Sequence, residues 1–190
     1  AMAIHFLGAS FDLHGGGADL RFPHHENEIA QSEAATNQKF VSTWMHVGYL
    51  QVNREKMSKS LGNFFTIRDL LKVHTAEVLR YLLASIHYRS PIQYSDDALT
   101  QSRSALERFY TALRDLPSAD AVQNSIYEKK FIEAMDDDFN SALAYAALFE
   151  LAKTMNGYVQ ENPVPSEELA EAQRTLVELG DVLGFDLLHP

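Results

Sequence analysis

Residues 54–63 read R-E-K-M-S-K-S-L-G-N and follow a strand-like run at 41–52. They precede a helix that should open with the capping-box pattern Thr66-x-x-Asp69. Two lysines and two serines supply the hydrogen-bond donors of this loop: Lys56, Ser58, Lys59 and Ser60. Ammonium groups and hydroxyls match phosphate oxygens, so such a loop can close over a polyphosphate, although an ordinary basic surface turn has the same composition.

The composition is that of a globular chain. Its 190 residues suit one or two domains, and a hydrophobic content of 46% is enough to build a core. No signal peptide or bilayer-spanning apolar run is recognisable, so we expect a cytoplasmic protein that does not bind membranes. The chain has no cysteine, which excludes a disulfide, a thiolate ligand and a cysteine nucleophile from within these residues.

The net charge of −10 is unevenly distributed. Residues 1–114 contain 12 Lys/Arg against 11 Asp/Glu, whereas residues 115–190 contain 4 against 15. Within the first part, residues 39–114 hold 11 basic and 6 acidic side chains. The overall acidity disfavours a non-specific polyanion binder but leaves room for a local basic track, and the acidic last third is typical of a solvated helical surface.

A glycine triplet follows a short apolar run near the start of the chain. We expect residues 11–14 to form a short buried strand that enters Gly15, Gly16 and Gly17. Three glycines let the backbone approach a ligand closely and tolerate positive φ, but they also suit a flexible turn. Asp19 comes just after them and can accept hydrogen bonds from ribose hydroxyls, or act as a helix cap or turn residue instead.

A histidine and a glutamate lie one helical turn apart in the next segment. The helix should open at Pro23 and run to about Ala35. His24 and Glu28 are spaced i, i+4, so they share a helix face and can bind one metal ion together. The string does not match the zinc-protease pattern, and two ligands do not complete a site. A solvated or hydrogen-bonded pair is the alternative interpretation.

Everything after the lysine loop reads as helical. Apolar residues recur at helical spacing in four segments, which we expect to form the core: 79–86, 106–113, 144–151 and 169–179. Ser95, Asn140 and Ser166 are N-cap candidates. Asp136-Asp137-Asp138 fits no calcium-loop spacing, so we interpret these carboxylates as favouring the positive N-terminus of the helix after Asn140.

Four strings occur in a fixed order: F-D-L-H-G-G-G-A-D-L at 11–20, F-P-H-H-E-N-E at 22–28, R-E-K-M-S-K-S-L-G-N-F at 54–64 and A-M-D-D-D-F-N at 134–140. Together they resemble the cysteinyl-tRNA synthetase family, which belongs to the class I aminoacyl-tRNA synthetases. The resemblance covers essentially the whole chain, including A-E-V-L-R-Y-L-L at 76–83. It implies formation of cysteinyl-adenylate from cysteine and ATP with Mg²⁺, then transfer of the cysteinyl group to the 3′ end of tRNA-Cys.

The resemblance implies roles by position. Lys59 would stabilise transition-state charge on the ATP phosphates, with Lys56 as the second catalytic lysine and Ser58 and Ser60 as nucleotide-binding residues of a mobile loop. Preorganised positive charge aimed at developing phosphate charge is the physical need, and a loop can supply it transiently. The glycine triplet at 15–17 and Asp19 would line the nucleotide pocket, with Asp19 placed for the ribose.

The resemblance also implies a zinc ion that binds the substrate thiolate, held by two cysteines, a histidine and a glutamate. His24 and Glu28 fall at the histidine and glutamate positions, and His25 and Glu26 are weaker candidates beside them. A zinc–thiolate bond rejects serine, which has no soft sulfur ligand, so a second editing site is unnecessary. Neither cysteine nor the family's H-I-G-H-type motif occurs in these residues, so we expect both outside this chain.

We expect an α/β half-domain followed by an all-α bundle. Residues 1–63 should be the C-terminal part of a Rossmann-like catalytic domain with the lysine loop, residues 64–115 a helical connection that contacts the tRNA stem, and residues 116–190 the rest of the helical bundle. Because the first half of the nucleotide-binding fold and the anticodon domain are missing, we expect the isolated chain to be a monomer without adenylation activity and with at most weak zinc binding.

Two other functions remain open. A ligase of the mycothiol type joins cysteine to an amino sugar through the same adenylate and shares the zinc and lysine-loop chemistry. A non-catalytic helical module that binds tRNA is the second alternative, and the missing ATP-binding half supports it for the isolated chain. The basic excess over residues 39–114 and the long helical region favour tRNA over an amino sugar as the acceptor.

Overall fold

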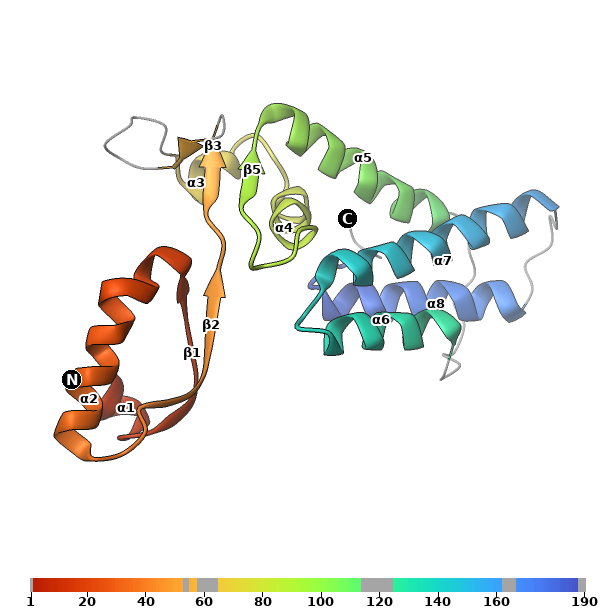
Figure 1. The fold of residues 1–190 in the computed structure, drawn as a ribbon. Coiled ribbons are helices and arrows are strands. Elements are labelled where there is room, and N and C mark those ends of the chain that lie inside the picture. Colours follow the sequence, from red (N-terminus) through yellow and green to blue (C-terminus); the bar gives the residue numbers. More distant parts are fainter. Residues whose placement is uncertain (1, 53–54, 58–64, 114–124, 162–166, 188–190) are drawn as a thin grey trace. The chain divides into compact units, whose positions relative to one another are not determined.

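A computed structural model describes the chain in five ranges: residues 2–52, 55–57, 65–113, 125–161 and 167–187. The chain forms two compact units. Unit 1 contains the described residues up to Met57 together with Tyr88–Gln93, and unit 2 contains those of 58–87 and 94–190. Figure 1 gives the order of the elements along the chain. The expected domain boundaries at 63/64 and 115/116 stay predictions.

Unit 1 is the α/β part of the chain (Figure 1). It begins with these elements: α1 (Met2–Leu7), β1 (Phe11–Gly17), η1 (Ala18–Leu20), η2 (Arg21–His25), α2 (Glu26–Thr36) and β2 (Val41–Val47). β1 and β2 pair in parallel, with Phe11 opposite Val41 and Gly17 opposite Val47. Parallel neighbours need a crossover between them, and α2 provides it, so this segment is a βαβ unit.

A second small sheet follows, with the strand order β4-β3-β5. Its strands are β3 (Leu50–Val52), β4 (Glu55–Lys56) and β5 (Ile92–Tyr94). The N–H of Ile92 donates to the carbonyl of Tyr49 at 2.8 Å, and the N–H of Gly48 donates to the carbonyl of Tyr88 at 2.7 Å. A Cβ at Gly48 would lie 2.2 Å from the carbonyl oxygen of Ser90, so glycine is required where these two segments meet.

Three local predictions for unit 1 need correction. The strand expected at 11–14 continues through the glycine triplet to Gly17, and its residues are half-buried or exposed rather than buried. None of these three glycines has a positive φ, so the triplet is not a flexible turn. The α-helix expected from Pro23 begins at Glu26, after a π-helical turn at Arg21–His25. The strand-like run at 41–52 is divided into β2 and β3.

Unit 2 is helical in its described residues, and its helices are α3 (Ile67–Leu70), α4 (Ala76–Ala84), α5 (Asp96–Leu113), α6 (Ile126–Asp136), α7 (Ser141–Glu161) and α8 (Glu167–Val182). The fold class expected from the sequence, α/β followed by all-α, is confirmed. Across the described ranges, no helix combines the length and the apolar character that a membrane span requires.

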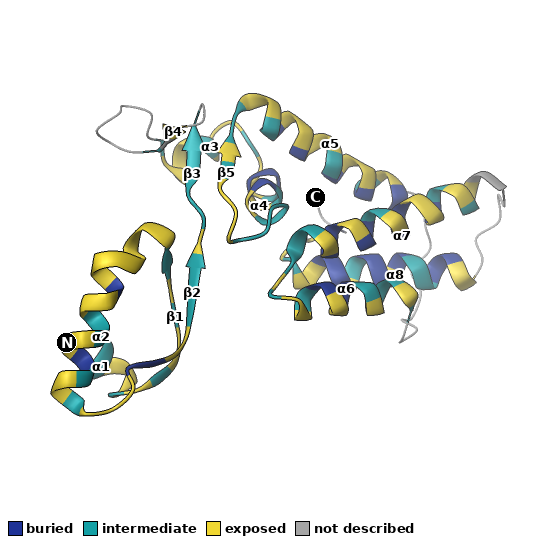
Figure 2. Ribbon diagram, in the orientation of Figure 1, coloured by how far each residue is buried: buried dark blue, intermediate teal, exposed yellow. Residues whose placement is uncertain are grey.

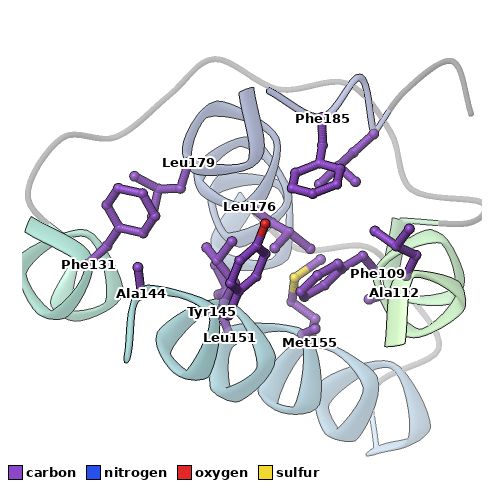
Figure 3. Packing of buried hydrophobic residues seen from close by; sticks show 14 of the residues in the cluster. Phe109, Ala112, Phe131, Ala144, Tyr145, Leu151, Met155, Leu176, Leu179 and Phe185 are labelled. Carbon is purple, nitrogen blue, oxygen red and sulfur yellow. The ribbon is translucent and has the colours of Figure 1, made fainter. Parts of the chain in front are cut away.

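The hydrophobic core of unit 2 lies along the inner faces of its long helices, which Figure 2 shows as buried stripes. In Figure 3, rings and aliphatic side chains from α5, α6, α7 and α8 point toward one another. Leu148, Leu151 and Leu176 are at most 1% exposed. Burying each such side chain contributes roughly 1.5–3 kcal/mol. Leu83 is an exception among the predicted core positions, because its exposed fraction is 44%.

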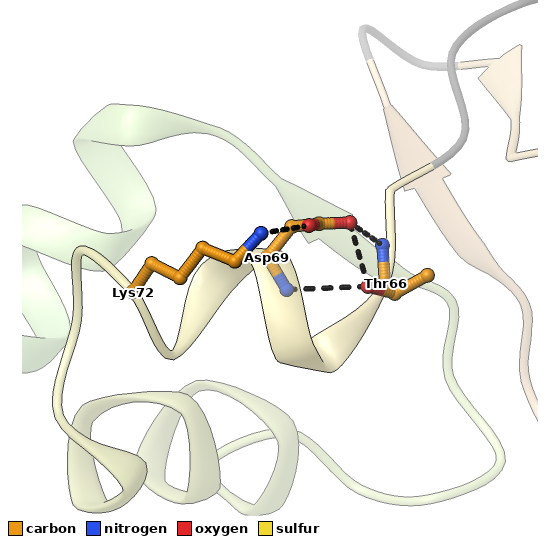
Figure 4. A network of polar contacts seen from close by, with 3 residues as sticks. All are labelled: Thr66, Asp69 and Lys72. Carbon is orange, nitrogen blue, oxygen red and sulfur yellow. Dashed lines mark hydrogen bonds and ion pairs between the residues drawn. The ribbon is translucent and has the colours of Figure 1, made fainter.

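The helix caps agree with the sequence where they are described. Thr66 and Asp69 form the predicted capping box at α3, and Lys72 extends it with an ion pair to Asp69 at 2.8 Å (Figure 4). The N–H of Leu143 donates to Oδ1 of Asn140 at 3.2 Å, which confirms the cap of α7. Ser95 caps α5, where its hydroxyl accepts from the N–H of Ala98. The cap predicted at Ser166 lies outside the described residues.

Candidate functional site

One face of the β1–β2 pair carries aromatic rings and a glycine. The strand register places His14 opposite Trp44 and Gly16 opposite His46. Because side chains two residues apart on a strand point to the same side, these four positions share one face of the sheet. The rings of His14 and Trp44 stack with centroids 4.4 Å apart, and those of Trp44 and His46 are nearly coplanar at 3°. The strands thus build a wall of rings.

His25 lies against this wall and is only 3% exposed. Its Nδ1 forms a hydrogen bond with Nε2 of His46 at 2.9 Å, and its ring centroid is 4.7 Å from that of Trp44. A Cβ at Gly16 would lie 2.6 Å from Cε1 of His25, so glycine leaves the room that this ring occupies. Burial lowers the pKa of His25 below its usual value, and the neighbouring imidazoles of His14 and His46 lower it further. His25 is therefore neutral at pH 7.

Glu28 of α2 faces the same group of histidines. One ligand atom from each of His14, His25 and Glu28 can be chosen so that all three lie within 4.8 Å of one another. Nε2 of His14 lies 3.7 Å from Oε2 of Glu28. Among the described residues, neither Nδ1 of His14 nor this Oε2 has a hydrogen-bond partner, although both atoms are buried. Buried polar atoms without partners are costly, so these two point to a ligand.

The chemistry of this group suits a zinc ion. Imidazole nitrogen and carboxylate oxygen are both zinc ligands, and a zinc-binding histidine is neutral. Donor atoms around a tetrahedral zinc ion lie ~3.3 Å apart, so small side-chain rotations would bring the 4.8 Å group to that spacing. The residues present therefore fit the metal that the resemblance implies, with at least one further ligand position left open.

The pair predicted from the helical spacing is also brought together. Nε2 of His24 lies 3.9 Å from Oε1 of Glu28. The side chain of His24 is 61% exposed, whereas that of His14 on the other side of Glu28 is 22% exposed. Glu28 is thus the common member of two arrangements, one on its own helical segment and one that crosses to β1. The helical spacing indicated only the first of them.

The predicted nucleotide-binding residues are placed only in part. Asp19 lines a cavity of about 660 Å³ together with Arg21, Phe22, Glu26 and Tyr49. The glycine triplet lies in β1, and Gly16 is explained by the ring of His25 rather than by a ligand. The backbone of Lys56 belongs to β4. Ser58, Lys59 and Ser60 lie outside the described residues.

Three residues of this site were missed by the sequence interpretation: His14, Trp44 and His46. They also line or adjoin a second cavity of about 470 Å³, whose wall includes His25, His46 and Trp44 together with Arg21 and Arg89. The signal available was weak, since Trp44 and His46 are two residues apart on a strand and so share a face. Their proximity to His25 depends on strand pairing, which single-sequence spacing does not specify.

Comparison with known proteins identifies relatives along almost the whole chain. A cysteine–tRNA ligase of Chromohalobacter salexigens is 56% identical over 185 residues, which is 97% of this chain and 40% of the relative. The corresponding ligase of Thioalkalivibrio sulfidiphilus is 55% identical over 97% of this chain, and that of Desulfitobacterium hafniense 49% identical over 100%. The chain spans about 40% of the length of these curated relatives.

Solved structures share the fold at low sequence identity. The LeuRS of Agrobacterium radiobacter K84, in a ternary complex with tRNA and LeuAMS, is similar over 92% of this chain and 28% of its own, with a TM-score of 0.65 at 20% identity. The methionyl-tRNA synthetase of Mycobacterium tuberculosis, in complex with methionyl-adenylate, covers 90% of this chain and 40% of its own, with a TM-score of 0.59 at 20% identity.

Two family profiles match the chain in sequence. Residues 130–188 match the DALR domain, which falls within the helical unit. Residues 1–104 match the profile described as the class I (C) tRNA synthetase catalytic domain, which is more than half of the chain. The chain belongs to the family of class I (C) tRNA synthetases.

Proposed function

We propose that this chain works as part of a cysteine–tRNA ligase. Such an enzyme activates cysteine with ATP to give cysteinyl-adenylate and then transfers the cysteinyl group to the 3′ end of tRNA-Cys. The observation that carries the proposal is the 49–56% identity to cysteine–tRNA ligases over at least 97% of the chain. The test is ATP–pyrophosphate exchange by the complete protein with cysteine and with serine; equal exchange with both amino acids would contradict the assignment.

Adenylation is assigned to the lysine loop and the glycine–aspartate segment. Lys56 and Lys59 would supply positive charge to the ATP phosphates, with Ser58 and Ser60 as further donors. Asp19, which lines the 660 Å³ cavity, would accept from the ribose hydroxyls, and Gly15 and Gly17 would allow close approach of the nucleotide. Lys59→Ala in the complete enzyme should lower the adenylation rate far more than cysteine affinity, and an unchanged rate would exclude the role given to Lys59.

A zinc ion is the proposed metal, with Glu28 as the ligand common to both arrangements. His24 is the histidine that the resemblance indicates, and His14 and His25 are the histidines whose nitrogens, with Glu28, form the 4.8 Å group. When bound, zinc would offer a soft-sulfur binding position for the cysteine thiolate. Metal analysis of His24→Ala, His14→Ala and Glu28→Ala identifies the ligands, because a ligand variant loses zinc. Full zinc in Glu28→Ala would contradict both arrangements.

tRNA is the proposed acceptor, and the cytoplasm and a monomeric state are the proposed setting. The relatives named above are tRNA ligases, which supports tRNA over an amino sugar. The helical unit would lie along the tRNA, as the basic excess at 39–114 suggests. A charging assay of the complete protein with tRNA-Cys, run beside one with an amino sugar, separates these acceptors. Product with the amino sugar alone would favour the mycothiol-type alternative.

A further inference from the structure

A hydrogen bond joins two imidazole rings at the candidate site, from Nδ1 of His25 to Nε2 of His46, at 2.9 Å. A neutral imidazole is protonated on one nitrogen and accepts with the other. Because Nδ1 of His25 is already bonded to His46, Nε2 is the nitrogen that remains for a ligand. This Nε2 has a free lone pair only when the proton of His25 is on Nδ1. His46 must then accept through Nε2 and carry its own proton on Nδ1.

The sheet holds both rings in this arrangement. His46 lies on β2 opposite Gly16, and its ring is nearly coplanar with that of Trp44. A Cβ at Gly16 would lie 2.8 Å from Nε2 of His25, so the ring of His25 fits only above a glycine. His25 is 3% exposed, which excludes most of the water that would otherwise compete for its nitrogens. Backbone geometry therefore decides where the two rings meet.

We propose that His46 is a positioning residue, which holds His25 in the tautomer with its proton on Nδ1 and leaves Nε2 as the atom that faces a metal ion. This inference rests on the metal site proposed around Glu28. A metal-binding histidine commonly donates its other ring N–H to a fixed partner, which sets its tautomer and orientation. Loss of such a partner typically lowers metal affinity by roughly 10–100-fold.

Packing alone is the competing explanation for the pair. His46 contributes a flat ring to the stack on Trp44, and an apolar ring would pack there equally well. The two explanations make opposite predictions for His46→Phe, which keeps a ring but removes the acceptor. His46→Gln is the matched control, because its amide oxygen keeps an acceptor without the aromatic ring.

The experiment uses the ¹⁵N-labelled 190-residue chain and long-range ¹H–¹⁵N spectra of its histidine rings at neutral pH. We expect His25 to carry its proton on Nδ1 in the unmodified chain and in His46→Gln, and to shift toward the Nε2-protonated form in His46→Phe. Circular dichroism and the emission of Trp44, the single tryptophan, check that each variant is folded. If His46→Phe fails this check, His46→Leu removes the acceptor with a smaller side chain.

Titration with Co²⁺ provides the second measurement. We expect the affinity of His46→Phe to fall roughly 10–100-fold and that of His46→Gln to stay within about threefold of the unmodified chain. An unchanged tautomer of His25 in His46→Phe, or a proton on Nε2 in the unmodified chain, would overturn the role of His46. If the unmodified chain binds no Co²⁺, the metal site fails for this chain, whereas the tautomer of His25 still decides whether His46 positions it.

Discussion

Glu77 of α4 accepts a hydrogen bond from the hydroxyl of Tyr110 on α5. Its other carboxylate oxygen accepts from the backbone N–H of Asp186 at 3.0 Å, so one side chain connects segments that are 33 and 109 residues away from it in sequence. Burial raises the pKa of Tyr110, and the hydrogen bond to Glu77 raises it further. A half-buried carboxylate thus ties α4 to α5 and to the segment after α8.

Glu77→Ala should lower the free energy of unfolding of unit 2 by roughly 1–3 kcal/mol, because two hydrogen bonds are lost and two donors are left without this acceptor. Urea denaturation followed by circular dichroism measures the change. Glu107→Ala on α5 is the control, since that side chain is exposed, and its effect should stay within about 0.5 kcal/mol. Equal effects of the two variants would contradict the link.

Leu176→Ala should destabilise the helical bundle by roughly 2–5 kcal/mol. Leu176 is 0% exposed and lies on α8 among residues of α7, so its truncation leaves a cavity that the surrounding helices fill only in part. Val182→Ala is the matched control on the same helix, because Val182 is 66% exposed. Thermal or urea unfolding compares them, and a loss below ~1 kcal/mol for Leu176→Ala would argue against the packing described for α8.

The capping box of α3 should titrate at low pH. The hydrogen bond from Lys72, followed by those from Thr66, lowers the pKa of Asp69 from 3.8 to about 2. Because the folded-state pKa lies below the unfolded one, this stabilisation is present above about pH 4 and is lost as the pH falls through about 2. ¹³C NMR titration of the Asp69 carboxyl measures the value directly.

Lys72→Met should raise that pKa toward 3.8, since it removes the largest cause of the shift. Lys153→Met removes an exposed lysine of α7 and should leave the titration of Asp69 unchanged. If both variants shift the curve equally, the local ion pair is not the cause.

Two glycine-to-alanine substitutions should change stability in opposite directions. Gly48→Ala would place a methyl group 2.2 Å from the carbonyl oxygen of Ser90, so we expect a loss of stability in unit 1. Gly157→Ala lies on an exposed turn of α7, where a methyl group meets no atom within 4 Å, and helix propensity should add about 0.5–1 kcal/mol. Denaturation curves compare them, and a neutral Gly48→Ala would contradict the close approach of the two segments.

Gly16→Ala should displace the ring of His25, because a Cβ there would lie 2.6 Å from Cε1 of His25. Gly15→Ala is the control, since the nearest atom to its added methyl group is 3.9 Å away. Trp44 contacts the ring of His25 and is the single tryptophan, so its emission reports the change without labelling. The same emission spectrum for both variants would show that His25 does not depend on Gly16.

The sequence by itself determined the features that depend on local spacing. Helical periodicity placed the core stripes around Leu148 and Leu176, and the Thr66-x-x-Asp69 pattern placed the cap of α3, because both rely on neighbours within one or two turns. The i, i+4 spacing of His24 and Glu28 was likewise sufficient to bring these side chains together. Whether they bind zinc stays a prediction.

Only the tertiary structure decided what surrounds Glu28. The glycine triplet suggested a flexible turn, whereas parallel pairing of β1 with β2 makes it a strand and sets Gly16 opposite His46. The register of two strands separated by a helix follows from packing over the whole βαβ unit, so no local pattern reveals it. That register brings His14, Trp44 and His46 to His25, because side chains distant in sequence meet only once the sheet has formed.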